Sequence, residues 1–465
     1  MNTTFEVYGK IGITPYPLSV IREYKVSRGL NKHDEAMIKG IIDPITLSQY
    51  QYLLGSNTCV TLYCQQENKR QLLFSGFLEH MEIYEVGEQR EVILKLSGLT
   101  RALDREEKLV DYQAENKMLS NMIDNIMEGY KKVCYDCLCE NKNIPDFLLQ
   151  YEETDYEFLK RVLSKEKAPI FTALTGNSGK ICFGKGKDET TIVKKETDYQ
   201  VIFDKGLYYR LKSRELYDLG MKIQLNEKKL IVKEAGYTLV DGEFQNEYVL
   251  CHEWAFEVGE LSNAKATGIS LDGIIQERQR DKVKIQLNQT PVTEKEKLRW
   301  FGYSSPAASS DGSGWYCMPE IGEEIRLYCP TEDEKEAYVI SAIRSSGENK
   351  SSTGKAGGGS GQGAKEPTNK SLSNVQGQSV DFTPEGVNLT CAGGVASMML
   401  SQNGEIIIAA ENTIELLSEE NIAIRAEQGI VVMGTDTISL INDAGSSVKM
   451  EDTITLDANR IKNNC

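Results

Sequence analysis

The C-terminal part of the chain carries a repeat of eight residues that runs from Met398 to Leu456. Each repeat has two apolar positions, separated by one residue. The first column of apolar residues is Met398, Ile406, Ile414, Ile422, Ile430, Ile438 and Ile454, with Ser446 as its one polar member, and the second column is Leu400, Ile408, Leu416, Ile424, Val432, Leu440, Val448 and Leu456. Because residues i and i+2 of a strand point to the same face, each repeat predicts one short strand with one buried face.

Small or turn-forming residues stand on either side of the two columns. The second column is followed by Ala410, Ser418, Ala426, Gly434, Asn442 and Ala458, with Met450 as the one large member, and the first is preceded by Thr413, Asn421, Gly429, Thr437, Gly445 and Thr453. Such side chains let the backbone bend after every strand. A fixed period of this kind predicts a stacked β architecture.

Two geometries fit a side of eight residues. Three repeats could form one coil of a single-chain β-helix, but the repeats present here would fill fewer than three coils, which makes a marginal stack. In the other geometry, three identical chains each supply one side of a triangular prism. A lone chain would leave its columns in water, so little apolar burial would offset the roughly 1–2 kcal/mol that ordering each residue costs. In an assembly of three chains, burying each column side chain contributes about 1.5–3 kcal/mol of stabilisation. We therefore expect a homotrimer with the column residues as its core.

In the first half of the chain, the spacing of apolar residues predicts strands with two helices between them. Apolar and polar residues alternate through 58–103 and again through 170–248, which is typical of strands. Met118, Met122 and Ile126 form an apolar stripe at helical spacing, and Gly129 stands where that helix would end. The fold class is therefore expected to be mainly β.

Three further stretches complete the predicted organisation. Residues 266–344 are expected to form a small separate barrel, with Trp300 and Phe301 as candidates for buried aromatic residues. Residues 345–380 are rich in glycine and serine and predict a flexible linker. The expected domains are thus 1–265, the barrel at 266–344, the linker at 345–380 and the repeat region at 381–465.

Composition narrows the class of protein. A chain of 465 residues has room for roughly three domains. Its 53 basic and 69 acidic side chains argue against a nucleic-acid partner, because such binding depends on Lys and Arg that neutralise phosphates. The first residues lack the basic-then-apolar pattern of a signal peptide, and no run approaches the roughly 20 apolar residues of a membrane span. We expect synthesis in the cytoplasm.

The sequence offers no complete set of residues for catalysis, a cofactor or a metal. Cys134, Cys137 and Cys139 lack a nearby fourth ligand for zinc, so we interpret them as reduced, partly buried thiols. His252 begins an H-E-x-x-H pattern, but Phe256 stands where the second histidine would be. Neither a phosphate-binding loop G-x-x-x-x-G-K-[ST] nor a nucleophile elbow G-x-S-x-G occurs.

The segment 150–163 is the most specific motif of the first half. Thr154 and Glu157 have the spacing of a helix capping box, which predicts a helix that begins there. The segment resembles the hub-domain motif QY-x-E-[ST]-D-x-x-F-L-x-R-L of the type VI secretion spike family (VgrG), through Gln150, Tyr151, Glu152, Thr154, Asp155, Phe158, Leu159 and Arg161. Lys167, Ala168 and Pro169 replace the glycine usual in that family, so we expect the next strand to enter differently.

Two more features resemble the same family. Pro319, Ile321, Gly322 and Ile325 match the turn and strand P-x-[IV]-G-x-x-[IV] of its oligonucleotide/oligosaccharide-binding (OB) fold domain. The repeat of eight is similar to the membrane-piercing prisms of contractile-tailed phages and of type VI spikes. The acidic run Glu320, Glu323 and Glu324 argues against nucleic-acid binding by the barrel, so we expect it to act as a spacer.

The resemblance implies a non-enzymatic homotrimeric spike in a contractile injection system, phage tail-like or type VI-like. It implies a hub of two barrel-like β subdomains, an OB-fold barrel and a trimeric intertwined β-helix. The trimeric hub would match a hexameric tail tube, and the implied partners are tube and baseplate proteins, a PAAR-type tip protein and effectors made as separate proteins. The alternative is a glycan-binding or cell-wall-degrading enzyme on a trimeric β-helix. No Trp, Tyr or Phe occurs from Val387 onward, which disfavours stacking on sugars.

Overall fold

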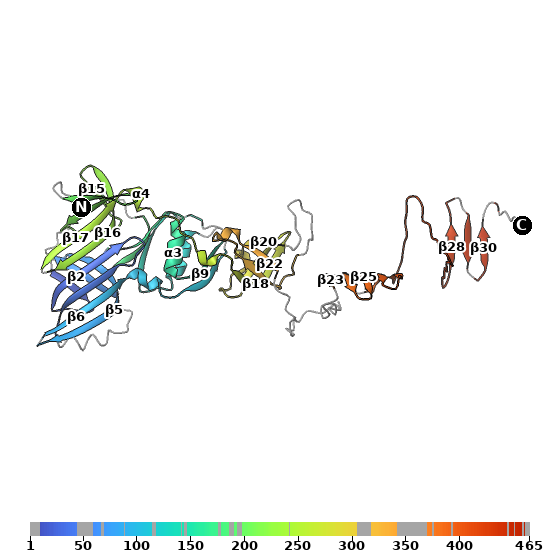
Figure 1. The fold of residues 1–465 in the computed structure, drawn as a ribbon, viewed down its shortest axis with the longest axis horizontal. Coiled ribbons are helices and arrows are strands. Elements are labelled where there is room, and N and C mark those ends of the chain that lie inside the picture. The colour runs from blue at the N-terminus through green and yellow to red at the C-terminus, as the bar shows by residue number, and fades with distance from the viewer. Residues whose placement is uncertain are drawn as a thin grey trace. The chain divides into compact units, whose positions relative to one another are not determined.

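We analysed the protein in a computed structural model. It describes residues 10–43, 59–66, 69–87, 89–113, 118–140, 142–143, 147–174, 178–185, 190–192, 198–240, 242–304, 318–341, 370–373, 376–391, 394–443, 446–450, 452–457 and 460. The chain divides into two compact units, residues 1–345 and 346–465, which are described separately (Figure 1). Strands dominate both units, which confirms the mainly β fold class.

The first unit contains one large sheet. Its twelve strands include a continuous path in the order β1-β4-β5-β6-β3-β2-β16-β17-β14-β13, and β15 extends it by pairing with β16 and β12. The strands are β1 (Lys10–Thr14), β2 (Val20–Gly29), β3 (Glu35–Ile42), β4 (Cys59–Gln66), β5 (Lys69–Val86), β6 (Gln89–Gly98), β12 (Thr190–Ile192), β13 (Tyr199–Phe203), β14 (Leu207–Ser213), β15 (Lys222–Leu225), β16 (Lys228–Val240) and β17 (Glu243–Cys251). Strand β2, which precedes the first predicted strand stretch, pairs with β16 of the second stretch and so joins the N-terminal strands to the later ones.

The alternation of apolar residues explains the main core of this sheet. In β3 every second residue, from Ala36 to Ile42, is buried, and the intervening residues are exposed or partly exposed. Tyr24, Tyr217 and Tyr248 are almost fully buried in the same core. Buried hydroxyl groups need partners. The Tyr248 hydroxyl donates to the backbone oxygen of Glu215 at 2.7 Å and accepts from the Tyr217 amide at 3.1 Å.

A second core forms where the helices pack against two small sheets. It is made by α2 (Leu119–Met127), α3 (Asp155–Ser164), the 3-10 turn η1 (Leu99–Leu103), the sheet of β10 (Ile170–Ala173), β11 (Lys180–Gly184) and β8 (Cys134–Leu138), and the pair β7 (Lys108–Tyr112) and β9 (Leu148–Glu153). The apolar stripe predicted a helix at α2, and this is confirmed: Met122, Ile123 and Met127 are buried on one face.

The helix α3 ends in a way that the sequence does not suggest. Lys167 adopts a left-handed conformation with a φ of 54°, and the amide of Ala168 donates to the oxygen of Leu163 at 3.0 Å. This is the geometry in which helices commonly end on glycine. Lys167 therefore takes the backbone role of a glycine, and β10 follows at Ile170.

The predicted small barrel is present and closed. Its strands are β18 (Ser270–Gln279), β19 (Lys282–Leu287), β20 (Trp300–Ser304), β21 (Glu324–Tyr328) and β22 (Tyr338–Ser341), in the closed order β18-β19-β20-β22-β21. Of the two aromatic candidates only Phe301 is buried. Trp300 is partly exposed, with the Lys284 ammonium 5.0 Å from its ring centroid, because neighbouring residues of a strand face opposite sides. The short helix α4 (Glu253–Phe256) packs against β16 of the large sheet. The helical turn η2 (Ala264–Ala266) precedes the barrel, and η3 (Lys295–Lys297) and η4 (Glu334–Glu336) lie between barrel strands.

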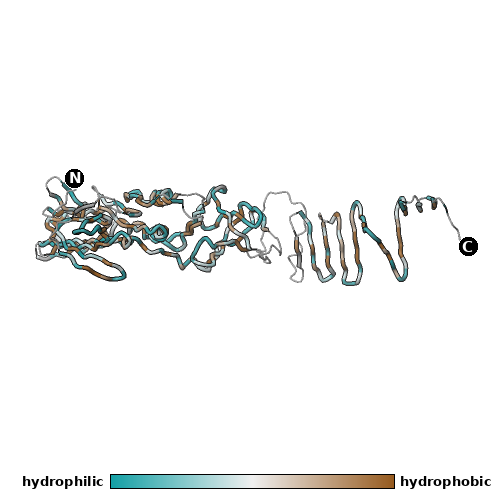
Figure 2. Tube along the Cα trace, turned by 90° about the horizontal axis from the view of Figure 1, so that it is seen from above, coloured by the Kyte–Doolittle hydropathy of each residue, from teal (hydrophilic) through white to brown (hydrophobic). Residues whose placement is uncertain are grey.

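The second unit consists of strands that run back and forth. One sheet contains β23 (Lys370–Ser373), β24 (Ser379–Thr383), β25 (Gly386–Cys391), β26 (Ala396–Ser401) and β27 (Ile406–Ala410), and another contains β28 (Ile438–Ile441), β29 (Ser447–Met450) and β30 (Ile454–Asp457). Figure 2 shows these successive passes, with hydrophobic residues along them. Strand structure begins at Lys370, inside the stretch expected to be linker, while residues 345–369 of that stretch lie outside the described residues.

Between β27 and β28 the chain keeps the period of eight. Bends occur at 411–412, 419–420, 427–428 and 435–436. Each bend falls between a small residue that follows the second column and the residue just before the first column. The turn-forming residues therefore bend the backbone at the places that the repeat predicts.

Candidate assembly interface

The two apolar columns are exposed in the isolated chain. Ile406 is 64% exposed, Ile424 68% and Ile454 71%. Side chains of the columns that are more than a third exposed are Leu400, Ile406, Ile408, Ile414, Leu416, Ile422, Ile424, Ile430, Val432, Leu440, Ile454 and Leu456. Soluble monomers rarely leave so many contiguous aliphatic side chains in water. We call this surface the column face.

Strand pairing places the column residues beside one another. In the first sheet, Met398 lies opposite Ile408 and Leu400 opposite Ile406. In the second sheet the second column continues across three strands, since Leu440 pairs with Val448 and Val448 with Leu456. Directly opposed residues have Cβ atoms about 4.5–5.5 Å apart, so the columns merge into a continuous apolar stripe in each sheet.

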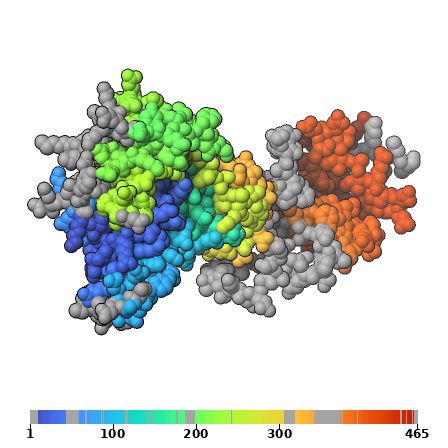
Figure 3. All heavy atoms as spheres, turned by 60° about the vertical axis from the view of Figure 1, so that its left-hand side comes forward, coloured from blue at the N-terminus to red at the C-terminus, as the bar shows by residue number. Residues whose placement is uncertain are grey.

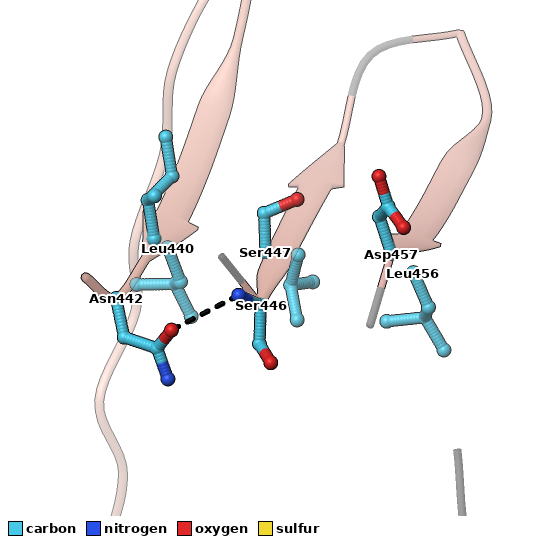
Figure 4. Close-up of a pocket in the computed structure, with 8 residues that line it drawn as sticks. Leu440, Asn442, Ser446, Ser447, Leu456 and Asp457 are labelled. Carbon is cyan, nitrogen blue, oxygen red and sulfur yellow. Dashed lines mark hydrogen bonds between the residues drawn. The ribbon is translucent and has the colours of Figure 1, made fainter. Parts of the chain in front are cut away.

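The β28–β30 sheet also carries a shallow hollow of ≈ 390 Å³. It is lined by Leu440, Val448, Leu456 and neighbouring polar residues (Figure 4). The Asn442 side chain accepts a hydrogen bond from the Ser446 amide at 3.0 Å and thereby holds the turn between β28 and β29. An apolar hollow open to solvent is a place where side chains of another chain can pack.

The described stretch 411–437 connects β27 to β28 and carries the middle part of both columns. Apart from the bends, none of its residues is assigned to a strand. Both columns run through this stretch, and Ile414, Leu416 and Ile430 are more than half exposed. Backbone groups and apolar residues left in this state can be paired and covered by another chain.

The hub motif lies around the start of α3. Thr154 is the N-cap: its Oγ1 accepts from the Glu157 amide and the Glu157 carboxylate accepts from the Thr154 amide, both at 3.1 Å. This confirms the predicted capping box. The Thr154 hydroxyl also donates to Asp104 at 2.6 Å. Burial alone would raise the pKa of Asp104, but the hydrogen bonds from Thr154 and His33 outweigh it and lower that pKa.

Gln150 and Asp155 fasten the same helix to the second core. Asp155 is almost fully buried and accepts from the Lys108 ammonium and the Tyr130 hydroxyl, each at 2.6 Å. The Gln150 amide donates to Asp155 at 3.0 Å. Phe158 and Leu159 are fully buried. These motif residues therefore serve the packing of the hub, and the Asp155 carboxylate is held in structural hydrogen bonds.

Glu152 and Tyr151 shape the strand that precedes α3. Glu152 has a φ of 47° and is the extra residue of a bulge, because Lys108 pairs with Glu153 while Leu109 pairs with Tyr151. The backbone oxygen of Glu152 accepts from Lys265 at 2.6 Å, and that of Tyr151 accepts from Asn263 at 2.8 Å. The bulge thus turns the backbone oxygens of the motif towards the segment that leads into the barrel.

Arg161, the last residue of the hub motif, connects the hub to the barrel. Its guanidinium is buried and donates to the Glu153 carboxylate at 2.7 and 2.8 Å and to the Leu149 oxygen at 2.9 Å. It also donates to Glu334, which lies in the barrel turn η4. Burial opposes the charge on Arg161, but the two carboxylates outweigh that effect and raise its pKa. We call Arg161, Glu153 and Glu334 the hub–barrel clamp.

Apolar packing accompanies the clamp. Phe147 and Leu149, at the start of β9, are buried in the barrel core rather than in the hub cores. The Phe147 ring lies edge-on to that of Phe301, with centroids 5.1 Å apart. Figure 3 shows the yellow residues of the barrel directly against the green and blue residues of the hub. Hub and barrel are therefore built as one body within the first unit.

The OB motif forms the turn that enters β21. Gly322 has a φ of 92°, and its amide donates to the Ile275 oxygen at 2.9 Å. Ile325 is buried in the barrel core, whereas Ile321 is exposed. Pro319 contributes its backbone oxygen, which accepts from Arg278 at 3.2 Å. The motif therefore fixes a turn and one core residue, and only a residue that tolerates positive φ suits position 322.

Gly322→Ala is expected to destabilise the first unit by about 1–2 kcal/mol, because alanine is strained at this backbone conformation. No atom lies within 4 Å of the added methyl group, so strain alone causes the loss. Gly302→Ala is the matched control, since its added methyl group is equally free and its φ is not positive. Urea unfolding followed by tryptophan fluorescence measures both. Equal midpoints for the two variants would contradict the strain argument.

The barrel matches a known protein family. Residues 271–343 match the family described as the type VI secretion system/phage-baseplate injector OB domain. The Escherichia coli c3393 protein, a type VI secretion component with structural similarity to the bacteriophage T4 tail proteins gp27 and gp5, has 10% identity and a TM-score of 0.51, over 71% of this chain and 99% of its own. The chain has the fold of a VgrG-like baseplate hub–spike protein.

Two structures of the Francisella PdpA–VgrG complex support this hub–spike fold. The half-lidded form has 10% identity and a TM-score of 0.54, over 86% of this chain and 87% of its own. The lidded form has 10% identity and a TM-score of 0.53, over 86% of this chain and 79% of its own. No curated protein sequence matches the chain.

The hub–spike fold accounts for what sequence reasoning found and for what it missed. The motif 150–163 pointed to α3, but the barrel partner of Arg161 had no signal, because Glu334 lies 173 residues away. Within the described residues, no group of three or more His, Cys, Asp or Glu is placed to hold a metal ion. His252 stands at the N-cap position of the short helix α4, without a capping hydrogen bond from its side chain. None of the helices that the structure describes is long and apolar enough to cross a bilayer.

Proposed function

We propose that this hub–spike protein is a homotrimer that forms the tip of a contractile injection machine and punctures the target envelope. The observation that carries the proposal is the column face: a strict repeat of eight whose aliphatic residues are exposed in one chain. Three copies around a shared axis would bury both columns and pair the free strand edges. The hub–spike fold supports the same assembly, because the column face follows a hub and an injector OB domain in the same chain.

The proposed mechanism is mechanical. In the trimer each pass of eight residues supplies one side of a prism, and each bend supplies a corner. Interchain pairing leaves few edges at which unfolding can begin, so the prism resists bending and fraying. Sheath contraction would drive this stiff prism through an envelope. No step of this mechanism requires a catalytic group, and we propose that the chain is not an enzyme.

The proposed partners follow from the two ends of the assembly. The hub would attach to a hexameric tail tube and to baseplate proteins, and a PAAR-type protein would sharpen the prism tip. Francisella VgrG is found in complex with PdpA, which supports binding of a separate protein to a hub–spike. The hub–barrel clamp supports transmission of force, because it makes the first unit one body from the tube side to the barrel.

The native mass tests the assembly. Sedimentation equilibrium of the purified full chain is expected to give three times the mass of one chain over a wide concentration range. A well-folded monomer would overturn the trimer and, with it, the puncturing role.

Sedimentation of contractile particles from the source cells tests the location. The particles are expected to contain this chain at a few copies each. Its presence only in the particle-free fraction would contradict a role at the tip.

A further inference from the structure

Cys137 and Cys139 lie in direct contact. Their Sγ atoms are 3.1 Å apart, and both side chains are partly exposed at the edge of the second hub core. Strand β8 ends at Leu138, and the backbone bends at Cys139. In a straight strand, residues i and i+2 would be about 6.6 Å apart along the chain. The bend therefore brings the two thiols together.

Gly184 holds this bend in place. It is paired with Leu138 in the parallel ladder of β11 and β8, and its φ is 123°. A Cβ atom at position 184 would lie 2.6 Å from the backbone nitrogen of Cys139. The Gly184 amide is anchored by donating to the Pro169 oxygen at 2.9 Å. The backbone of β11 thus lies tightly on the peptide between the two cysteines, and the thiol contact is built into the sheet.

The environment makes the two thiols unequal. The hydrogen bond from the Cys139 thiol lowers the pKa of Cys137 to about 7, whereas the same contact raises the pKa of Cys139. Cys137 therefore gives up its proton more readily than Cys139, and the thiolate is the nucleophilic form. Burial acts in the opposite direction on the core cysteines: it raises the pKa of Cys182 to about 12 and that of Cys251 to about 11.

We propose that Cys137 and Cys139 are a redox-active dithiol that reacts with small disulfides, with Cys137 as the attacking thiol and Cys139 as the resolving thiol. The Cys137 thiolate attacks one sulfur of the small disulfide, the S–S bond breaks, and one small thiolate leaves. Cys139 then loses its proton and attacks the Cys137 sulfur, which releases the second small thiolate. The two protein thiols lose two electrons and two protons, and the small disulfide gains them to become two thiols.

The local geometry suits a reversible reaction. Closing the bond shortens the Sγ–Sγ distance from 3.1 Å to about 2.05 Å, which needs little backbone movement. A disulfide between residues two apart is strained, and strained disulfides are easily reduced. If the proposed function is correct, the chain leaves a reducing cytoplasm on delivery, and the bond would form outside the cell. The chemistry itself does not depend on that function.

Glutathione disulfide is the probe, applied at neutral pH to the reduced, folded full chain. Mass spectrometry of the intact chain is expected to show the loss of two hydrogen atoms, and peptide mapping is expected to place the new bond between Cys137 and Cys139. Cys139→Ser is expected to stop at a glutathione adduct on Cys137. Cys137→Ser is expected to lower the rate of any reaction at Cys139 at least tenfold. Dithiothreitol is expected to restore the free thiols of the native chain.

Cys134→Ser is the matched control, because Cys134 is an exposed thiol at the start of the same strand. This variant is expected to form the disulfide at a rate within twofold of the native chain. Adducts on Cys134 or Cys391 without a bond between Cys137 and Cys139 would overturn the proposal, as would a bond that forms only in urea. The native mass of the chain is measured independently, so failure here is distinguishable from failure of the proposed trimer.

Discussion

Replacing Ile422 and Ile424 by aspartate is expected to convert the proposed trimer into monomers. Both residues are more than half exposed in the isolated chain and belong to the two columns. Burying each such side chain would stabilise the proposed assembly by about 1.5–3 kcal/mol, and a trimer would hold three copies of each. The double variant loses that burial and also forces carboxylates into a dry axis, where unpaired charges are strongly unfavourable. Each 1.4 kcal/mol lost weakens association about tenfold, so dissociation at micromolar concentration is expected.

The matched control adds the same charge at the bends. Asn412→Asp together with Gln428→Asp places two aspartates per chain at bend positions, which would form the corners of the prism. This control is expected to remain trimeric, because corner side chains stay in water. Sedimentation equilibrium of both variants measures the difference. If the column variant sediments as a trimer, the column face is not the axis. If both variants dissociate, charge repulsion rather than the column face controls assembly.

Arg161→Met is expected to destabilise the first unit by about 3–5 kcal/mol, because the carboxylates of Glu153 and Glu334 would remain buried without a cation. The side chains of Arg161 and Glu334 are only 3% and 4% exposed, so water cannot replace the lost hydrogen bonds. Lys165 lies 3.5 Å from Glu334 and compensates only in part. Urea unfolding followed by tryptophan fluorescence measures the loss.

An exposed ion pair of the barrel provides the control. Arg326 is 2.9 Å from Asp272, and their side chains are 38% and 55% exposed. Arg326→Met is expected to change stability by about 0–1 kcal/mol, as is usual for surface pairs. Adding Glu153→Gln and Glu334→Gln to Arg161→Met is expected to recover part of the loss. A loss for Arg161→Met no larger than that for Arg326→Met would show that the clamp does not stabilise the unit.

Features that depend on neighbours in the sequence were predicted well. The stripe from Met122 to Ile126 and the capping box at Thr154 both correspond to helices, because the forces that form a helix start act over three or four residues. The bends at 411–412 and beyond fall where turn-forming residues repeat. Gly322 likewise has the positive φ that its place in a turn motif suggests.

Features that depend on distant residues were not predicted. Glu334 meets Arg161, and β2 meets β16, only because the chain folds back over long separations. The interpretation of Trp300 as buried was wrong because a shift of one residue along a strand reverses the face. Lys167 takes the place of a glycine since the surrounding contacts outweigh its backbone preference.

The sequence by itself determined the period of the C-terminal strands, the start of α3 and the mainly β class, because each is set by residue spacing and local backbone preference. Only the tertiary structure decided that hub and barrel are joined by a buried guanidinium and that Cys137 touches Cys139. Those contacts depend on where a backbone bends and on which elements meet. Spacing along a chain does not encode that information, whereas packing in three dimensions does.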